Sequence, residues 1–179
     1  VDRDEVVQQA VKDLTAKVRA EGRKSVIVFC IDIDHCDHVA RELRRFGIQA
    51  GIVTGKTSND ERERLVEGFK TGRIQYLLSV NVFFEGFNVR RVDCVAMLRP
   101  TQSKGLWVQA IGRGLRLHDG KNYCLVLDYG DNISRHGPID IDDGDDVKLA
   151  KCGNCENVFS QAVKECPSCG WEIPPEQRE

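Results

Sequence analysis

The sequence lacks three features, each of which would have placed it in a well-defined class. No stretch of its 179 residues approaches the 18 apolar residues of a membrane-spanning helix, and the polar N-terminus does not resemble a signal peptide. The formal net charge is only −2, so nucleic-acid binding would have to come from local patches rather than from a global positive field. No GxxxxGK(S/T) phosphate loop and no acidic Mg²⁺-holding motif occurs. The chain by itself therefore cannot cradle the β- and γ-phosphates of a nucleotide.

The composition that is present is typical of a globular protein. Hydrophobic residues make up 41% and charged residues 30% of the chain, which is long enough for one sizeable core and a small second unit. We expect a soluble, cytoplasmic protein. The chain opens on Val1-Asp2 without a methionine, inside an expected helix, so we interpret it as a piece of a longer polypeptide.

Hydrophobic periodicity predicts an alternation of helices and strands. Ser58 begins a capping box that Glu61 completes, Gly72 ends that helix, and Asp34 is the expected cap of a helix that stops before Gly47. The expected helices cover residues 4–21, 34–46, 58–70 and the segment around 109–116, and the expected strands cover 25–30, 49–53, 74–79, 92–98 and 123–128. This order predicts an α/β fold: an open, mainly parallel sheet with helices on both faces.

Ligands of such sheets bind at the carboxyl ends of the strands. That rule selects five loops as candidate functional segments: residues 30–35, 54–58, 79–88, 99–104 and 128–131. Three of these loops are rich in glycine, serine, threonine or charge.

The segment from Gln109 to Arg116 is the strongest candidate for a phosphate-binding site. If it is helical, Gln109, Arg113 and Arg116 share one stripe, while Val108, Ile111 and Leu115 face the core. Arginine carries a permanent charge and a planar donor fork that matches phosphate oxygens. The alternative is an ordinary solvated face with surface ion pairs.

The eight cysteines fall into two groups. Cys30, Cys94 and Cys124 lie in apolar runs and Cys36 on a helix, so we expect buried free thiols there. The other four form a CxxC…CxxC arrangement near the C-terminus: Cys152, Cys155, Cys166 and Cys169. Four thiolates at this spacing are typical of a structural Zn²⁺ ribbon, and the metal would supply the folding free energy of a tail too short for its own core. The alternative is a pair of disulfides, which an intracellular chain disfavours.

Three units follow from these patterns: residues 1–137, an acidic linker at 138–150, and a zinc-ribbon module at 151–179. The run from Asp140 to Asp146 resembles a calcium loop only superficially, because its glycine is out of register. Around the four cysteines, Lys148, Lys151, Lys164 and Trp171 could contact phosphate or stack on a base, or could be surface residues and a hydrophobic plug.

Taken together, the motifs of residues 24–131 resemble the second RecA-like motor lobe of a superfamily 2 helicase or translocase. Residues 109–116 resemble motif VI and residues 79–89 motif V. Ser25–Cys30 with His35 resembles motif IV, and residues 54–69 resemble the segment that follows it. Residues 93–105 are similar to the restriction-enzyme and phage-related branch, which implies a bacterial or phage-type context.

The resemblance implies that ATP with Mg²⁺ binds between this lobe and an upstream RecA-like lobe. Arg116 would be the arginine finger, Arg113 a second phosphate clamp, and Gln109 would orient an arginine or the attacking water. It further implies nucleotide contacts at Glu85, Gly86, Asn88 and Gly112. Contacts with the backbone of DNA, or of RNA, would come from Thr54, Gly55, Lys56, Ser79, Val80, Arg90 and Arg91.

Two departures from the motif V pattern weaken parts of this interpretation. Asn81 and Asn88 stand where many members carry aspartate, and Val80 replaces a common threonine, so a contact at Val80 would need backbone N–H groups. The leading hypothesis is a helicase or translocase lobe that is inactive as an ATPase without its partner lobe. The alternatives are a non-catalytic zinc-ribbon adaptor that binds nucleic acid or protein, and an unrelated doubly wound nucleotide-binding domain.

Overall fold

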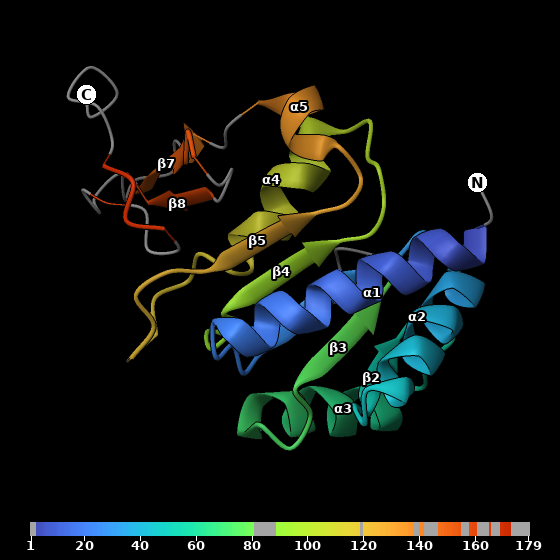
Figure 1. Cartoon of the computed structure of the whole chain (residues 1–179). Coiled ribbons are helices and arrows are strands. Elements are labelled where there is room, and N and C mark those ends of the chain that lie inside the picture. The colour runs from blue at the N-terminus through green and yellow to red at the C-terminus, as the bar shows by residue number, and fades with distance from the viewer. Residues whose placement is uncertain are drawn as a thin grey trace.

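A five-stranded parallel sheet forms the centre of the protein (Figure 1). The computed structural model describes residues 3–80, 89–118, 120–137, 140–141, 147–154, 158–160, 165 and 169–172. The strands are β1 (Val26–Phe29), β2 (Ala50–Val53), β3 (Tyr76–Ser79), β4 (Cys94–Met97) and β5 (Leu125–Asp128), arranged in the order β2-β3-β1-β4-β5. Every pair of neighbours is parallel, so all five carboxyl ends lie at one edge. The predicted open parallel sheet is confirmed, with each predicted strand in place.

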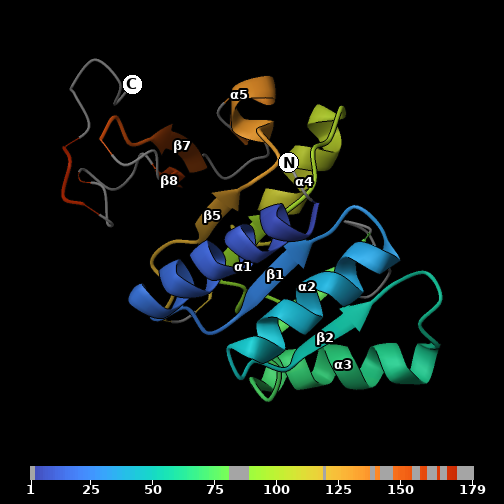
Figure 2. The ribbon, with the colours of Figure 1, turned by 45° about the vertical axis from the view of Figure 1, so that its right-hand side comes forward.

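Helices cover both faces of this sheet, as the sequence predicts. In Figure 2, α1 (Arg3–Ala20) and α2 (Ile33–Arg45) lie in front of the sheet. Their buried side chains, among them Leu14 and Leu43, form one core with alternate strand residues. On the other face, α3 (Asn59–Thr71) and α4 (Lys104–Gly112) bury Phe69 and Trp107 against the remaining strand residues. Continuous apolar strands are therefore buried on both sides, the pattern expected of a parallel sheet.

Local capping accounts for most helix boundaries. The hydroxyl of Ser58 accepts a hydrogen bond from the backbone N–H of Glu61 at 3.3 Å, and Gly72 ends α3 in the left-handed conformation, as predicted. The expected cap at Asp34 is wrong: the carboxylate of Asp32 accepts from the backbone N–H of His35 at 2.8 Å, so α2 begins two residues earlier. Asp32 has the extended backbone that a capping residue needs, whereas Asp34 already lies in the first turn of the helix.

The prediction of four buried, free thiols is confirmed. Cys30, Cys36, Cys94 and Cys124 all lie inside the core without a disulfide. Burial raises the pKa of Cys94 and raises that of Cys124 to about 12. These thiols behave as small apolar side chains rather than as nucleophiles.

A second, antiparallel sheet follows α5 (Asn132–His136). It consists of β6 (Asp140–Ile141), β7 (Val147–Lys151) and β8 (Val158–Ser160), and lies on the β5 side of the main sheet (Figure 1). Part of the predicted linker at 138–150 is therefore strand, because its residues from 147 pair with strands on both sides. The boundary between the predicted units stays a prediction. Within the described part of the chain, no helix is both long and apolar enough to cross a bilayer.

Candidate nucleotide and nucleic-acid interface

The loop after β2 presents polar groups at the carboxyl edge. The backbone N–H of Thr54 donates to Oγ1 of Thr57 at 2.9 Å, and the N–H of Thr57 donates back to the carbonyl of Thr54 at 3.2 Å. The N–H of Lys56 donates to the Thr54 hydroxyl at 3.2 Å, which closes a compact turn. Gly55 and Lys56 are exposed at its tip. The fold thus displays a cation and an accessible glycine backbone where a phosphate could approach.

The end of β3 offers fewer accessible groups for a phosphate contact than its sequence indicates. Ser79 is only 2% exposed, and its carbonyl accepts from the N–H of Cys30 at 2.8 Å. The carbonyl of Val80 accepts from Nη1 of Arg99 at 2.7 Å. A phosphate contact by the hydroxyl of Ser79 would therefore need a local rearrangement. Glu85, Gly86 and Asn88, together with Asn81, lie outside the described residues.

A buried amide connects the loops that follow β4 and β5. Asn132 is fully buried; its Oδ1 accepts from the N–H of Thr101 at 2.7 Å, and its Nδ2 donates to the carbonyl of Arg99 at 3.0 Å. Nδ2 also donates to Oδ1 of Asp128 at 2.8 Å. A Cβ at Gly130 would collide with the Arg99 carbonyl, so only glycine permits this close approach. The network thus fixes the backbone of Arg99, whose side chain donates to the carbonyl of Val80.

The arginine segment is built differently from the predicted helical stripe. Helix α4 ends at Gly112, Arg113 is its C-cap, and Arg116 lies in the turn beyond it. The expectation of one continuous helical face through Gln109, Arg113 and Arg116 is therefore wrong, because the glycines at 112 and 114 favour a turn over helix continuation. The predicted core face survives: Ile111 is buried, and Val108 and Leu115 pack against the same core.

The two arginines nevertheless remain neighbours. Both are half-buried, and Gln109 is exposed. Burial lowers the pKa of Arg113, and the charge of Arg116 lowers it further. The two positive charges repel each other, and a nearby anion would reduce that repulsion.

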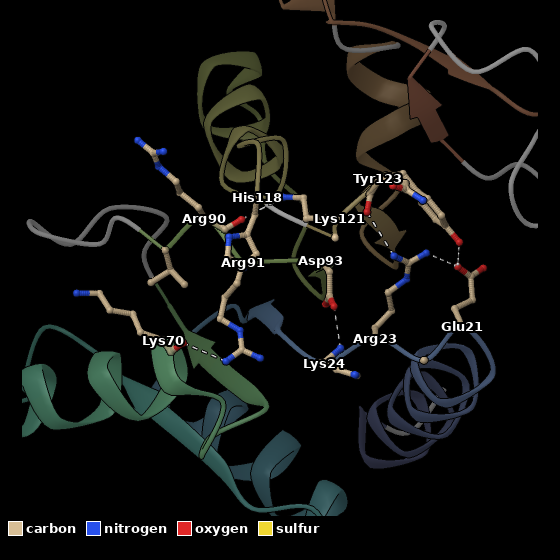
Figure 3. A pocket seen from close by; sticks show the side chains of 14 residues that line it. Glu21, Arg23, Lys24, Lys70, Arg90, Arg91, Asp93, His118, Lys121 and Tyr123 are labelled. Atoms are coloured by element: carbon tan, nitrogen blue, oxygen red, sulfur yellow. Dashed lines mark hydrogen bonds and ion pairs between the residues drawn. The ribbon is translucent and has the colours of Figure 1, made fainter.

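The amino edge of the sheet carries a hollow of about 770 Å³ (Figure 3). It is lined by many charged residues, including Arg23, Lys24, Lys70, Arg90, Arg91 and Lys121. Several of these have structural partners. Nη1 of Arg91 donates to the carbonyls of Phe69 and Lys70 at 3.4 and 3.0 Å, which caps the C-terminus of α3. Its guanidinium is thus engaged within the fold, whereas Arg90, drawn with the other lining residues in Figure 3, is exposed.

Two other groups in this region hold the strands together. The carboxylate of Asp93 accepts from the backbone N–H groups of Lys24 and Ser25 at 2.8 and 2.9 Å, which ties the start of β1 to the start of β4. Arg23 stacks 3.8 Å from the ring centre of Tyr123 and pairs with Glu21 at 2.8 Å. Sequence reasoning gave no role to Lys121, Arg99 or Asn132. The signals for two of them were the position of Arg99 inside the selected loop at 99–104 and that of Asn132 directly after the selected loop at 128–131.

The C-terminal cysteines are described only in part. Sγ of Cys152 and Sγ of Cys169 lie 3.5 Å apart, and the backbone N–H of Asn154 approaches Sγ of Cys152 at 3.4 Å. Cys155 and Cys166 lie outside the described residues. Among the residues that are described, no group of three or more potential metal ligands is found. A Cβ on Gly153 would lie 2.9 Å from the ring of Trp171, so the indole packs against the turn that follows Cys152.

Comparison with known proteins agrees with this architecture. The family model described as the helicase conserved C-terminal domain matches residues 6–118. A Schizosaccharomyces pombe protein named as a mitochondrial ATP-dependent helicase, irc3, is 41% identical over 116 residues, which are 65% of this chain and 19% of that protein. A 51.5 kDa protein of a Lactococcus phage is 28% identical over 189 residues, covering 97% of this chain and 40% of the phage protein. The chain thus spans well under half the length of these relatives.

Solved structures share the fold. A fragment named as an HsdR subunit of a type I restriction enzyme from Vibrio vulnificus superposes with a TM-score of 0.65 at 23% identity, covering 78% of this chain and 30% of that one. The Escherichia coli DEAD-box protein SrmB superposes with a TM-score of 0.63 at 18% identity, covering 73% and 78% of the two chains. The resemblance to a RecA-like second motor lobe of a helicase is confirmed. The chain belongs to the helicase conserved C-terminal domain family.

Proposed function

We propose that this chain is the second motor lobe of an ATP-dependent helicase or translocase that moves along nucleic acid. The family match and the relatives named as ATP-dependent helicases support the motor assignment. The sequence has no phosphate loop, so a first lobe must bind the β- and γ-phosphates and Mg²⁺. Hydrolysis by this chain alone is not expected.

The observation that carries the proposal is the paired display of Arg113 and Arg116 where α4 ends. Their mutual repulsion is relieved when a polyphosphate from the facing lobe enters between them. Arg116 would stabilise charge on the transferred phosphoryl group, and Arg113 would hold a second phosphate oxygen. A finger of this kind contributes a factor of about 10³–10⁵ to the rate. Gln109, exposed one turn earlier, would orient an arginine or the attacking water, and Gly112, Glu85, Gly86 and Asn88 would complete the nucleotide contacts.

The test uses the full-length protein that contains both lobes. Arg116→Ala is expected to reduce kcat for nucleic-acid-stimulated ATP hydrolysis by about 10³-fold or more, with a smaller effect on KM. Arg41→Ala, which changes an exposed arginine of α2, is the matched control. A retained rate in Arg116→Ala contradicts the finger assignment. A protein that binds nucleic acid yet hydrolyses no ATP would favour the adaptor alternative.

We propose that the nucleic-acid backbone binds at the carboxyl edge, with Gly55 and Lys56 as the exposed contacts and Thr54 behind them. Ser79 and Val80 would contribute through the backbone. Arg90 lies by the hollow at the amino edge, so its predicted contact would involve a separate stretch of the nucleic-acid backbone. DNA is our preferred substrate because residues 93–105 resemble the restriction-enzyme branch. Other relatives are named as RNA helicases, and the yeast Mss116p domain 2 was solved with an RNA duplex.

The salt dependence of binding tests the backbone contact, and stimulation of ATP hydrolysis separates DNA from RNA. Lys56→Ala should weaken binding uniformly across sequences and reduce the slope of log K against log salt by about 1. Lys12→Ala, an exposed lysine of α1, is the control. Equal stimulation of hydrolysis by DNA and RNA oligonucleotides, or by RNA alone, would overturn the DNA preference. A salt-insensitive interaction would contradict backbone binding.

The predicted cytoplasmic location stays a prediction, since one relative is named as mitochondrial.

We further propose that Cys152, Cys155, Cys166 and Cys169 bind one structural Zn²⁺. Two thiolates on a tetrahedral zinc with bonds of about 2.3 Å lie about 3.8 Å apart. The 3.5 Å between Cys152 and Cys169 is close to this value and far beyond the roughly 2.05 Å of a disulfide. The N–H group of Asn154 directed at Cys152 would stabilise thiolate charge, as outer-shell donors do at metal sites.

Metal analysis tests this assignment. Freshly purified protein should contain about one zinc per chain, and a chelator should release it and unfold only the C-terminal module. Cys169→Ser should lose the metal, whereas Cys124→Ala, which changes a core thiol, should keep it. Protein without metal that presents four reactive thiols in this module would contradict the ribbon.

A further inference from the structure

Lys121 connects two segments that are distant in sequence. Its Nζ donates to the carbonyls of Gly114 and Arg116, each at 2.6 Å, and to the carbonyl of Val92 at 2.8 Å. The carbonyl of Arg90 lies 3.3 Å from the same nitrogen. Figure 3 shows the Lys121 side chain at the edge of the hollow beside Arg90 and Arg91. One ammonium group therefore joins the segment that leads into β4 to the segment that carries the arginine pair.

The geometry suits an ammonium group in particular. Three protons on one nitrogen match the three short contacts, and the positive charge is attracted to the negative oxygen ends of three carbonyl groups. Burial lowers the pKa of Lys121, while Cys124 and Asp93, the facing acidic groups, raise it. A guanidinium is planar and spreads its donors over several ångströms, so it cannot converge on the same point. An apolar side chain would leave the carbonyls without this donor.

Neither segment is held in this way by its own secondary structure. Arg113 and Gly114 donate their N–H groups to Ala110 and Ile111 as α4 ends, which fixes the start of the turn. The carbonyls of Gly114 and Arg116, by contrast, point to Lys121. The direction in which the Arg116 side chain leaves the backbone therefore depends on this ammonium.

We propose that Lys121 is a positioning residue that holds Arg116 in its productive orientation and couples it to residues 89–92, which lead into β4. The inference rests on the proposed role of Arg116. Through the carbonyls of Val92 and Arg90, the same ammonium links Arg116 to the segment that leads into β4. A displacement of about 1 Å at a catalytic group can cost about 100-fold in rate.

The experiment compares Lys121→Met and Lys121→Arg with Lys24→Met in the full-length, two-lobed protein. Lys24 lines the same hollow, is exposed, and serves as the control. We expect Lys121→Met to lower kcat for ATP hydrolysis about 10- to 100-fold while KM for ATP changes less than about threefold, because the lost group orients a residue that acts in the transition state. Lys121→Arg keeps the charge and should show a smaller loss of kcat in the same direction.

A double variant separates positioning from general damage. If Lys121 acts through Arg116, Lys121→Met should lower kcat no further in an Arg116→Ala background. Additive losses would overturn the inference, as would unchanged kcat in Lys121→Met. Should that variant fail to fold, Lys121→Arg and its combination with Arg116→Ala give the same comparison.

Hydrogen exchange distinguishes failure of this inference from failure of the proposed function. In Lys121→Met, the amides of residues 113–117 and 89–92 should exchange at least about tenfold faster, with no change in α1 and α2. Unchanged exchange in these segments overturns the role of Lys121 even if Arg116→Ala abolishes hydrolysis. Faster exchange together with a fully active Arg116→Ala would contradict the finger assignment instead, and with it the catalytic role inferred for Lys121.

Discussion

Gly114 lies between the two arginines and gives the sharpest stability test of the structure. A Cβ added there would overlap Sγ of Cys124 and lie 3.0 Å from Cγ2 of Val95 and 3.2 Å from Cβ of Cys124. Cys124 and Val95 belong to the core on the α4 side of the sheet, where neither can move without disturbing other contacts. The arginine turn can thus pack against β4 and β5 only because residue 114 has no side chain.

Gly114→Ala is therefore expected to destabilise the protein. Overpacking of one methyl group into a filled core typically costs about 1–3 kcal/mol, and overlap with a buried sulfur places this case near 2–3 kcal/mol. For a chain of this size, each kcal/mol lowers Tm by about 2–4 °C, so we expect a decrease of about 4–12 °C in thermal unfolding followed by circular dichroism. Gly112→Ala is the control, because its Cβ would meet nothing within 4 Å.

Combination with Cys124→Ala tests the stated cause. Removal of the sulfur should recover at least about 1 kcal/mol of the loss from Gly114→Ala, measured as a coupling free energy in urea unfolding. Wild-type stability in Gly114→Ala would refute the reasoning. So would equal losses in Gly112→Ala and Gly114→Ala, because the expected difference comes only from the space around residue 114.

Three further predictions concern pH and helix ends. Burial raises the pKa of Cys124 to about 12 from an ordinary value of 9.0, so its contribution to stability is complete below pH 9 and declines by at most about 4 kcal/mol as pH rises toward 12. Above pH 9, the Tm of a Cys124→Ala protein should therefore fall less steeply than that of the wild type, and identical slopes would contradict this prediction. Asp32→Ala should cost about 1 kcal/mol in urea unfolding and Asp34→Ala only a few tenths, because only Asp32 accepts from the N–H of His35; the reverse order would restore the cap first expected from the sequence. Arg91→Ala should cost about 0.5–1.5 kcal/mol through loss of its bonds to the carbonyls of Phe69 and Lys70, while Arg90→Ala, at an exposed position, should leave Tm within about 1 °C.

Features that depend on neighbouring residues were predictable. The five apolar runs became the five strands, and the cap at Ser58 formed because its hydroxyl and the N–H group of Glu61 lie three residues apart. The wrong cap at Asp34 also concerns neighbouring residues. Asp32 and Asp34 could each cap the helix, and only the extended backbone of Asp32 decides between them.

The site was predicted in its chemistry but not in its construction. Sequence spacing brought Arg113 and Arg116 together correctly, yet a helical stripe was the wrong reason, because α4 ends at Gly112. Beyond that helix, the turn packs Gly114 so closely against Cys124, ten residues further along the chain, that no side chain fits at position 114. Helical periodicity contains no information about such contacts.

By itself, the sequence determined the parallel α/β architecture, the buried thiols, and a pair of arginines in a polypeptide without a phosphate loop. Those results follow from hydrophobic period, local capping and residue chemistry, all of which act over a few positions. Only the tertiary structure decided that Arg91 caps a helix, that Asn132 connects two loops, and that Lys121 joins the arginine turn to the segment before β4. These bonds link residues about 20 to 30 positions apart, and their partners are chosen by strand order and register, which bring together backbone carbonyls that no sequence pattern distinguishes.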